Sequence, residues 1–181
     1  MNRVPSNEKK KDNYSKEVLI SREEINRRVE QLGREISQDY KGRELHLVGV
    51  LNGAFIFLAD LVRHLSIPCQ ICFLQASSYK DQLVSTGKVK LMHNLDLNGK
   101  DVLVVEDIFD TGLTLKHISE DLYIQKPTSL EICALLNKRI PDKLAVNVKY
   151  IGFEIENRFV VGYGLDYAEK YRELPYISCL D

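Results

Sequence analysis

The stretch Asp101-Val-Leu-Val-Val-Glu-Asp-Ile-Phe-Asp-Thr-Gly-Leu-Thr-Leu115 decides the expected fold, because an apolar run in it meets two acids and then a turn. The four consecutive apolar residues Val102 to Val105 are typical of a strand buried on both faces, as in a parallel sheet between helices. Leu115, Ile118 and Leu122 recur on one face of a helix that follows. The stretch therefore predicts a strand, a loop and a helix, with the loop at the sheet edge where such folds bind ligands.

The turn between this strand and this helix has the composition of an anion-binding loop. It consists of Asp110, Thr111, Gly112, Leu113 and Thr114. Its hydroxyl groups, backbone N–H groups and helix start suit a phosphate, whereas the preceding Glu106 and Asp107 would repel one unless a cation intervenes. We expect residues 110–114 to hold a monophosphate, and the two acids to face sugar hydroxyls or a hard cation such as Mg²⁺. A solvated acidic loop that binds nothing is the competing interpretation.

Length and composition indicate one globular domain. The chain has 181 residues, of which 44% are hydrophobic, and a formal net charge of -1, which provides no field for nucleic acid or an anionic membrane. No apolar run approaches the ~20 residues of a membrane helix, and the Lys-rich start lacks the apolar segment of a signal peptide. We expect a cytoplasmic protein with a flexible N-terminal arm at residues 1–18 and a single domain at residues 19–181.

The four cysteines are expected to be structural thiols. Cys69, Cys72, Cys133 and Cys179 lie within or beside apolar, strand-like segments. Cys69 and Cys72 have the spacing of a redox pair, but residues three apart in an extended segment point to opposite faces. The pattern does not favour a redox or zinc site.

A second strand, turn and helix precede the motif. Ser21 and Glu24 form a capping box that predicts the start of an earlier helix, which presents Ile25, Val29, Leu32 and Ile36 on one face. A strand is then expected from Glu44 to Val50, followed by the turn Leu51-Asn-Gly-Ala54 and a helix from Phe55 to Leu65. Gly53 would allow an anion to approach the backbone closely, although a plain turn without a ligand is the alternative.

Further strands and one long loop complete the pattern. Residues 69–75 and 129–136 suggest buried strands, and the alternating residues 89–93 suggest a half-exposed one. The polar residues 76–88 are a longer connection than most, which is typical of functional or mobile loops. Lys138 lies at the carboxyl end of the later buried strand, where it could donate to a carbonyl oxygen of a ligand, although a lysine there is more often solvated.

Residues 104–115 resemble the phosphoribosyl-pyrophosphate motif of type I phosphoribosyltransferases, and they are most similar to the hypoxanthine-guanine branch. The resemblance spans roughly residues 44–177. It implies an α/β fold whose central, mostly parallel sheet is flanked by helices, with a small hood for the base formed mainly by about residues 138–181 with N-terminal contributions. It also implies a purine salvage reaction in which phosphoribosyl pyrophosphate and a 6-oxopurine give IMP or GMP and pyrophosphate.

The resemblance assigns roles on the donor side of this reaction. Asp110 would be the general base, and Glu106 and Asp107 would lie beside the ribose and the metal. Asn52, Gly53 and Arg172 would contact pyrophosphate. The family usually has a basic residue in place of Asn52, often after a cis peptide bond, so one positive charge is missing here. Ser78 and Tyr79 match the Ser-Tyr pair of a lid that excludes water from the reaction.

The resemblance also assigns the base site, in the segment from Phe153 to Tyr167. Phe159 would stack on the purine, Val160 would offer backbone groups to its edge, and Lys138 would recognise O6 and thereby reject adenine. Asp166 would lie near pyrophosphate and a second Mg²⁺. The implied metal ligands are Glu106, Asp107 and Asp166.

Three alternatives stay open at this point. The same fold could prefer xanthine or guanine, because no residue that reads the purine 2-position is visible. The chain could instead be a non-catalytic, phosphoribosyltransferase-like regulator that senses nucleotide or binds RNA, or a homologue inactivated by Asn52. Family analogy suggests a homodimer or homotetramer.

Overall fold

The structure, a computed structural model, describes residues 17–78, 89–92 and 95–180. The helices are α1 (Arg22–Asp39), α2 (Phe55–Leu61), the 3-10 helix η1 (Val62–His64) and α3 (Leu113–Ile124). The strands are β1 (Val18–Ile20), β2 (Leu45–Leu51), β3 (Cys69–Ser78), β4 (Val89–Met92), β5 (Asp101–Phe109), β6 (Ser129–Arg139), β7 (Tyr150–Glu156), β8 (Val160–Val161) and β9 (Ile177–Cys179).

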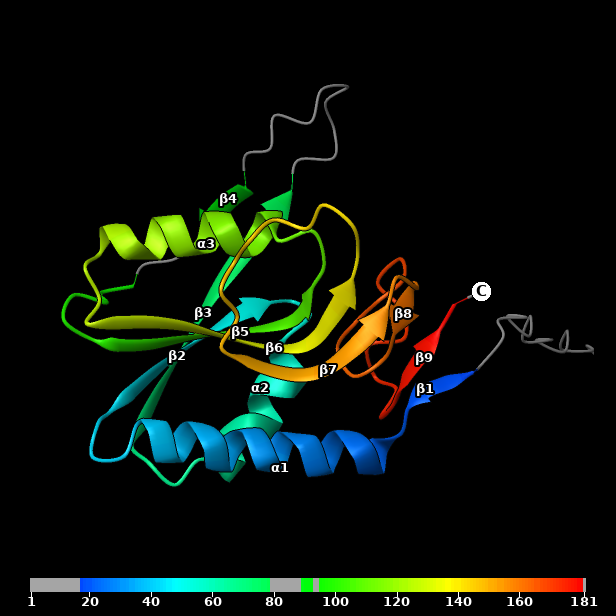
Figure 1. Ribbon diagram of the computed structural model, residues 1–181, viewed down its shortest axis with the longest axis horizontal. Helices are drawn as coiled ribbons and strands as arrows, with labels where there is room; N and C mark the ends of the chain where they lie inside the picture. The colour runs from blue at the N-terminus through cyan, green and yellow to red at the C-terminus, as the bar shows by residue number, and fades with distance from the viewer. Residues whose placement is uncertain (1–16, 79–88, 93–94, 181) are drawn as a thin grey trace, which may run out of the picture.

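A six-stranded sheet forms the centre of the protein. Its strand order is β4-β3-β2-β5-β6-β7, and every neighbouring pair is parallel except β3 with β4. Helices α1 and α2 cover one face of this sheet, and α3 covers the other (Figure 1). The predicted α/β class with a mostly parallel, helix-flanked sheet is confirmed.

A second, antiparallel sheet joins the two ends of the described chain. Its order is β1-β9-β8, so the first strand pairs with the last, for example Val18 with Ser178. This small sheet lies beyond the ends toward which β6 and β7 run (Figure 1). The strand β1 begins at Val18, the last residue that the sequence assigned to the flexible arm.

Two apolar cores sit on opposite faces of the central sheet, and β5 contributes to both. Leu103 and Val105 pack into the core that includes α1 and α2, whereas Val102 and Val104 pack into the core that includes α3. All four side chains are completely buried. The continuous apolar run of β5 follows from this burial on both faces.

Several predicted boundaries are confirmed, and others are wrong. The capping box exists, since the side chain of Ser21 accepts from the N–H of Glu24 and the Glu24 carboxylate accepts from the N–H of Ser21. The predicted helix to Leu65 is divided, because α2 ends at Leu61 and η1 follows. The strand β5 continues past the acids to Phe109, because backbone pairing with β6 does not depend on side-chain polarity.

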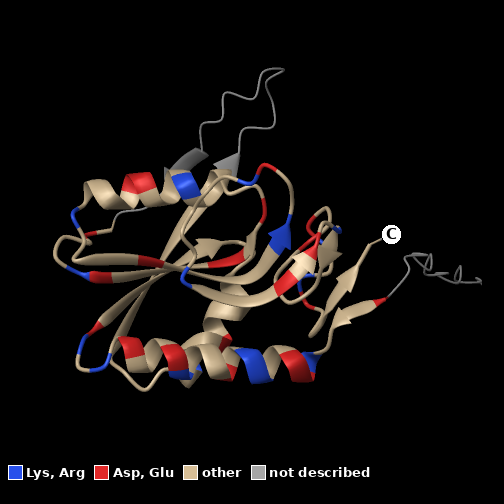
Figure 2. Ribbon diagram, viewed as in Figure 1, with Lys and Arg blue, Asp and Glu red and all other residues tan. Residues whose placement is uncertain are grey.

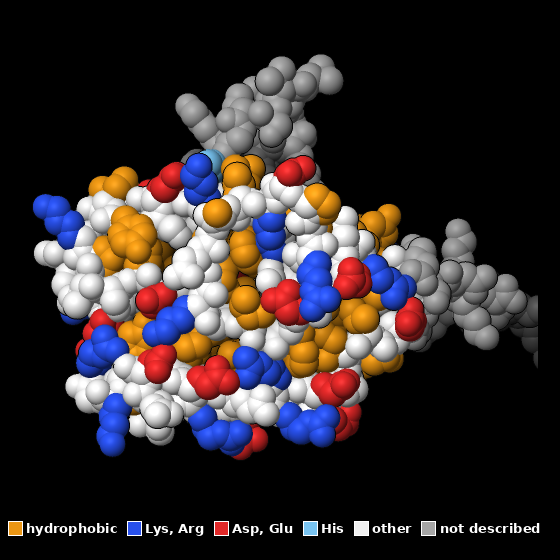
Figure 3. Space-filling view, viewed as in Figure 1, with side chains coloured by type: hydrophobic (Ala, Val, Ile, Leu, Met, Phe, Trp, Pro, Cys, Tyr) orange, Lys and Arg blue, Asp and Glu red, His pale blue; other side chains and the backbone are white. Residues whose placement is uncertain are grey.

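The surface agrees with the balanced composition. Side chains of both charges are interspersed over the face seen in Figure 3. Within the described segments, no helix has both the length and the apolar character needed to span a membrane. All four cysteines are free, with Cys133 and Cys179 buried and Cys69 and Cys72 partly exposed.

Leu103→Ala tests the central position of β5. Leu103 is wholly buried, so truncation removes apolar contacts and leaves a cavity that should lower the free energy of unfolding by about 2–5 kcal/mol. Urea unfolding of the variant measures this loss. The control is Ile124→Ala, because Ile124 is 77% exposed and should lose little. Equal stability of the two variants would contradict the packing described here.

Candidate active site

Two adjacent carboxylates are buried near the carboxyl end of β5. Glu106 and Asp107 are each 8% exposed, and Figure 2 shows acidic positions on the part of the sheet that faces the small sheet. Burial, and then repulsion by Asp107, raises the pKa of Glu106 well above its usual range. Burial also raises the pKa of Asp107, whereas hydrogen bonds with Glu106 and the backbone and the nearby Arg172 oppose this shift. The pair needs a proton or a cation.

The turn after β2 packs directly against this acidic pair. A Cβ atom on Gly53 would lie 1.6 Å from Oδ2 of Asp107, so only glycine allows the turn and the carboxylate to approach so closely. The peptide bond between Leu51 and Asn52 is cis, as the family resemblance implied. The side chain of Asn52 is exposed. The structure thus brings the predicted pyrophosphate turn to the predicted metal-side acid.

The predicted phosphate loop encloses a small cavity. The cavity has a volume of about 140 Å³ and is lined by Glu106, Ile108, Phe109, Asp110, Thr111, Gly112, Thr114 and Leu115. Gly112, with φ 87°, is the N-cap of α3, so no side chain of that residue covers the first N–H groups of the helix. Main-chain donors and the positive end of a helix dipole favour an anion at this place.

Lys138 and Asp110 meet at the ends of two neighbouring strands. The Nζ of Lys138 donates to Oδ2 of Asp110 over 3.2 Å. The lysine side chain is 11% exposed and the aspartate side chain is 46% exposed, so the pair borders solvent on the aspartate side. A hydrogen-bond donor and an acceptor therefore stand side by side.

Sequence reasoning missed Lys143, whose Nζ donates to the carbonyl oxygens of Phe109 and Lys138 over 2.7 and 2.8 Å. No local pattern marked it, because it follows a Pro-Asp pair in a polar connection.

The segment 162–172 supplies Arg172 and Asp166. Arg172 donates to the carbonyl oxygen of Gly164 over 2.7 Å and forms an ion pair with Asp166 over 2.8 Å. A Cβ on Gly164 would lie 2.1 Å from the carbonyl oxygen of Gly53, so this segment touches the predicted pyrophosphate turn. Its non-glycine residues with positive φ are Tyr163, Ala168, Glu169 and Tyr171. Strained backbone of this kind clusters at functional sites.

An exposed aromatic ring stands in the predicted base site. Phe159 is 52% exposed, and its ring contacts Tyr167 edge to face at 5.8 Å between centroids. Val160 is buried in β8, next to it. About half of the Phe159 side chain thus remains exposed, as stacking on a base would require.

Some predicted site residues are not brought together. Within residues 17–78, 89–92 and 95–180, no three His, Cys, Asp or Glu side chains are grouped to hold a metal, so Asp166 does not join Glu106 and Asp107. Asp166 instead pairs with Arg172. Ser78 is the last residue of β3, and Tyr79 lies outside the described residues.

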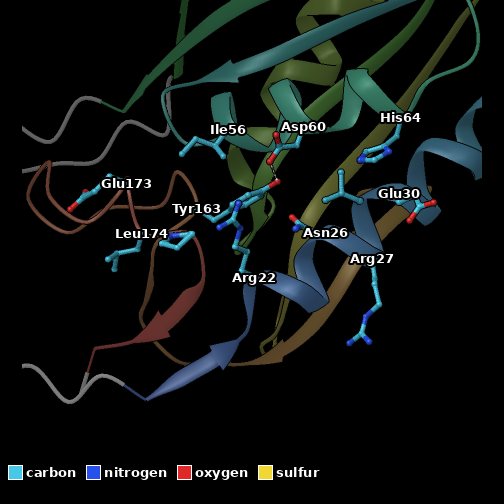
Figure 4. A pocket seen from close by; sticks show the side chains of 12 residues that line it. Arg22, Asn26, Arg27, Glu30, Ile56, Asp60, His64, Tyr163, Glu173 and Leu174 are labelled. Carbon is cyan, nitrogen blue, oxygen red and sulfur yellow. Dashed lines mark hydrogen bonds between the residues drawn. The ribbon is translucent and has the colours of Figure 1, made fainter.

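A separate cavity of about 620 Å³ lies between α1, α2 and the segment that leads to β9 (Figure 4). Its lining includes Arg22, Asn26, Ile56, His64, Tyr163 and Leu174, and none of the predicted site residues. Tyr163 donates to Asp60 over 2.8 Å at this cavity. The hydrogen bond anchors the segment of Arg172 to α2.

Comparison with known proteins shows the family of this chain. Residues 15–168 match the phosphoribosyl transferase domain. The chain is 48% identical over 170 residues to a hypoxanthine-guanine phosphoribosyltransferase of Dictyostelium discoideum, covering 91% of this chain and 94% of the relative. It is 46% identical over 169 residues to a hypoxanthine phosphoribosyltransferase of Salmonella typhimurium, covering 91% of this chain and 95% of the relative.

Solved structures show the same relationship. A hypoxanthine-guanine phosphoribosyltransferase of Bacillus anthracis superposes with a TM-score of 0.86 at 43% identity, over 92% of this chain and 99% of that chain. A hypoxanthine phosphoribosyltransferase of Staphylococcus aureus gives a TM-score of 0.88 at 42% identity, over 97% of both chains. Sequence and fold agree, and the chain belongs to the phosphoribosyltransferase family.

Proposed function

We propose that this protein is a purine salvage enzyme that transfers the 5-phosphoribosyl group of phosphoribosyl pyrophosphate to hypoxanthine and guanine. The products are IMP or GMP and pyrophosphate. One observation carries the proposal: Lys138 and Asp110 lie 3.2 Å apart beside the phosphate loop. A 6-oxopurine presents O6 next to N7, so the lysine can donate to O6 while the carboxylate accepts from N7. The names of relatives 46–48% identical to this chain support the same activity.

Other elements of the site bind the different groups of phosphoribosyl pyrophosphate and the purine. Residues 110–114, the last two of which begin α3, bind the 5′-phosphate. The turn at Gly53 and the guanidinium of Arg172 bind pyrophosphate, since guanidinium matches phosphate oxygens well. Phe159 stacks on the purine, and backbone groups of Val160 bind its edge. In the same proposal Ser78 and Tyr79 belong to the lid.

The reaction breaks the bond between C1′ and pyrophosphate, and a ring nitrogen of the purine forms the new bond to C1′. Positive charge grows on the ribose as the leaving group departs, so donors fixed beforehand around the leaving oxygens lower the barrier. Asp110 accepts the proton that the purine loses, or stabilises it at N7. Lys138 disfavours adenine, because the amino group of adenine would place two donors opposite each other.

The acidic pair fits a Mg²⁺ ion. Oε2 of Glu106 is buried and has no hydrogen-bond partner, and the pKa of Glu106 is raised by burial and by Asp107. Oxygen ligands of this kind suit Mg²⁺, and Glu106 and Asp107 would hold it, whereas Asp166 stays paired with Arg172 on the pyrophosphate side. When bound, the ion would neutralise charge on the pyrophosphate.

The assembly and the location stay predictions. We expect a homodimer or a homotetramer, which gel filtration with light scattering would distinguish. The expected cytoplasmic location would be checked by fractionation of cells that produce the protein.

A panel of bases tests the proposed function. Purified protein with Mg²⁺ and phosphoribosyl pyrophosphate should form nucleotide from hypoxanthine and guanine, and little or none from adenine or uracil, because Lys138 selects an oxygen at position 6. Chromatography of the products measures this, and xanthine in the same panel tests the rival preference. Absence of product with every base would contradict the proposal that the protein is an enzyme, and turnover of uracil would contradict the assignment to purines.

Asp110→Asn tests the general base. The amide keeps the shape but cannot take up a proton, so kcat should fall about 100-fold or more. The KM for phosphoribosyl pyrophosphate should change much less, as steady-state kinetics will show. Asp142→Asn is the matched control, since Asp142 is exposed in a nearby loop. Unchanged turnover in Asp110→Asn would remove this residue from the role.

Glu106→Gln tests the cost of burying the acidic pair. The raised pKa means that folded protein binds this proton more tightly than unfolded protein does, so stability falls as the pH rises above the ordinary range of Glu. In metal-free buffer the variant should match wild type near pH 4 and exceed it near pH 8, by about 1 kcal/mol or about 2–4 °C in Tm. Differential scanning fluorimetry measures both.

The same variant also tests the ion. Added Mg²⁺ should raise the Tm of wild type more than that of Glu106→Gln, because binding to the folded state stabilises it. Glu120→Gln, an exposed carboxylate on α3, is the control and should respond as wild type does. A Tm at pH 8 equal to that of wild type would contradict the burial cost of Glu106.

A further inference from the structure

Lys143 binds the ends of two neighbouring strands together. Its Nζ donates to the carbonyl oxygen of Phe109 over 2.7 Å, to the carbonyl oxygen of Lys138 over 2.8 Å, and to Oδ1 of Asn137. It also lies 3.6 Å from the centroid of the Phe109 ring. An ammonium group has three N–H donors, and here each has an acceptor.

The acceptors lie at the point where β5 and β6 stop pairing. Phe109 is the last residue of β5, and it pairs with Asn137 of β6. The carbonyl group of Phe109 is part of the peptide bond to Asp110. The carbonyl group of Lys138 belongs to the residue whose side chain donates to Asp110. Beyond this point no backbone pairing holds β5 and β6 together. The hydrogen bonds of Lys143 hold the two strand ends there instead.

The surroundings of Lys143 fix its orientation. Asn137 donates to Oε1 of Glu154 over 2.7 Å, so its amide oxygen is turned toward Lys143. The pKa of Lys143 is lowered, first by burial, while Glu154 and Asp110 act in the opposite direction. Hydrogen bonds from a partly desolvated ammonium group are stronger than those in water.

Residue 144 continues the same contact toward the phosphate loop. The N–H of Leu144 donates to the carbonyl oxygen of Thr111 over 3.0 Å. Leu144 thus contacts the phosphate loop, whereas Lys143 contacts the strand end that precedes it, and neither is among the residues assigned to purine or phosphate.

We propose that Lys143 is a positioning residue that fixes the main chain at Phe109 and Lys138, so that Asp110 and Lys138 meet the purine at a set separation. The role rests on the proposed function. Lys143 does not touch the base, and it acts only through the two residues that do.

Lys143→Met is the test variant, because methionine keeps an unbranched apolar side chain and removes all three donors. The KM for hypoxanthine should rise about 10-fold or more, since hydrogen bonds from a charged donor contribute about 1.5–3 kcal/mol and 1.4 kcal/mol is tenfold. The KM for phosphoribosyl pyrophosphate should change by less than about 3-fold, because the phosphate contacts remain. An unchanged KM for hypoxanthine would overturn the positioning role.

Lys149→Met is the matched control. Lys149 lies in the same connection and also contacts aromatic rings, but it pairs with Asp39 over 2.9 Å, near the start of β7. This control should keep both KM values of wild type. Lys143→Arg retains a cation with several donors and should recover part of the lost affinity for hypoxanthine. No recovery, or an equal loss in Lys149→Met, would contradict the proposal.

A double-mutant cycle separates positioning from general stability. If Lys143 acts through Lys138, then Lys143→Met should cost much less in the background of Lys138→Met than in wild type. Two independent effects would instead multiply. Multiplicative losses in kcat/KM for hypoxanthine would show that Lys143 acts elsewhere.

Hydrogen exchange of the ligand-free protein gives a measurement that does not depend on activity. Peptides over residues 106–112 and 136–140 should exchange about 5-fold faster or more in Lys143→Met, and unchanged in Lys149→Met, because the strand ends open more often. Unchanged exchange would show that Lys143 does not fix these ends. If wild type transfers no purine while exchange responds as expected, the proposed function fails and the structural role stands.

Discussion

The burial of two adjacent carboxylates at the end of β5 is the constraint on which the site depends. Glu106 and Asp107 belong to a strand that is buried on both faces, so their negative charges destabilise the folded protein unless a counter-ion is present. The turn at Gly53 and the segment of Arg172 both pack around this pair. The burial of this pair lowers the stability of the folded protein, and in the proposed function the same pair provides oxygen ligands for Mg²⁺.

The strand order sets the order of the proposed chemistry. β2, β5 and β6 are neighbours, and parallel strands lie about 5 Å apart, so their carboxyl ends form a short row. The pyrophosphate turn follows β2, the phosphate loop follows β5, and Lys138 stands at the end of β6. The leaving group, the ribose phosphate and the purine of the proposed reaction lie in the same sequence along this row. Doubly wound sheets bind ligands at this edge because the loops after neighbouring parallel strands lie side by side there.

Contacts distant in the chain hold the parts of the site in place. Tyr163 fixes the segment of Arg172 to α2 through Asp60, and Lys143 fixes the ends of β5 and β6. The pairing of β1 with β9 closes the small sheet next to Phe159. The contact of Lys143 joins strand ends that carry Asp110 and Lys138, so the protein can hold these two residues of the proposed purine site at a fixed distance.

The sequence by itself determined the class of fold, the start of α1, the apolar strand β5 and the turn after it, because local periodicity and turn chemistry specify such features. It placed the end of this turn too late, since α3 begins at Leu113, inside the expected loop 110–114. It did not determine that β5 continues through the two acids, since that depends on hydrogen bonds with β6. It also gave no sign of Lys143. Only the tertiary structure decided which distant groups meet: Gly53 with Asp107, Lys138 with Asp110, and Lys143 with both strand ends. The physical reason is that pairing and packing across the sheet join residues whose separation in the chain leaves no local pattern.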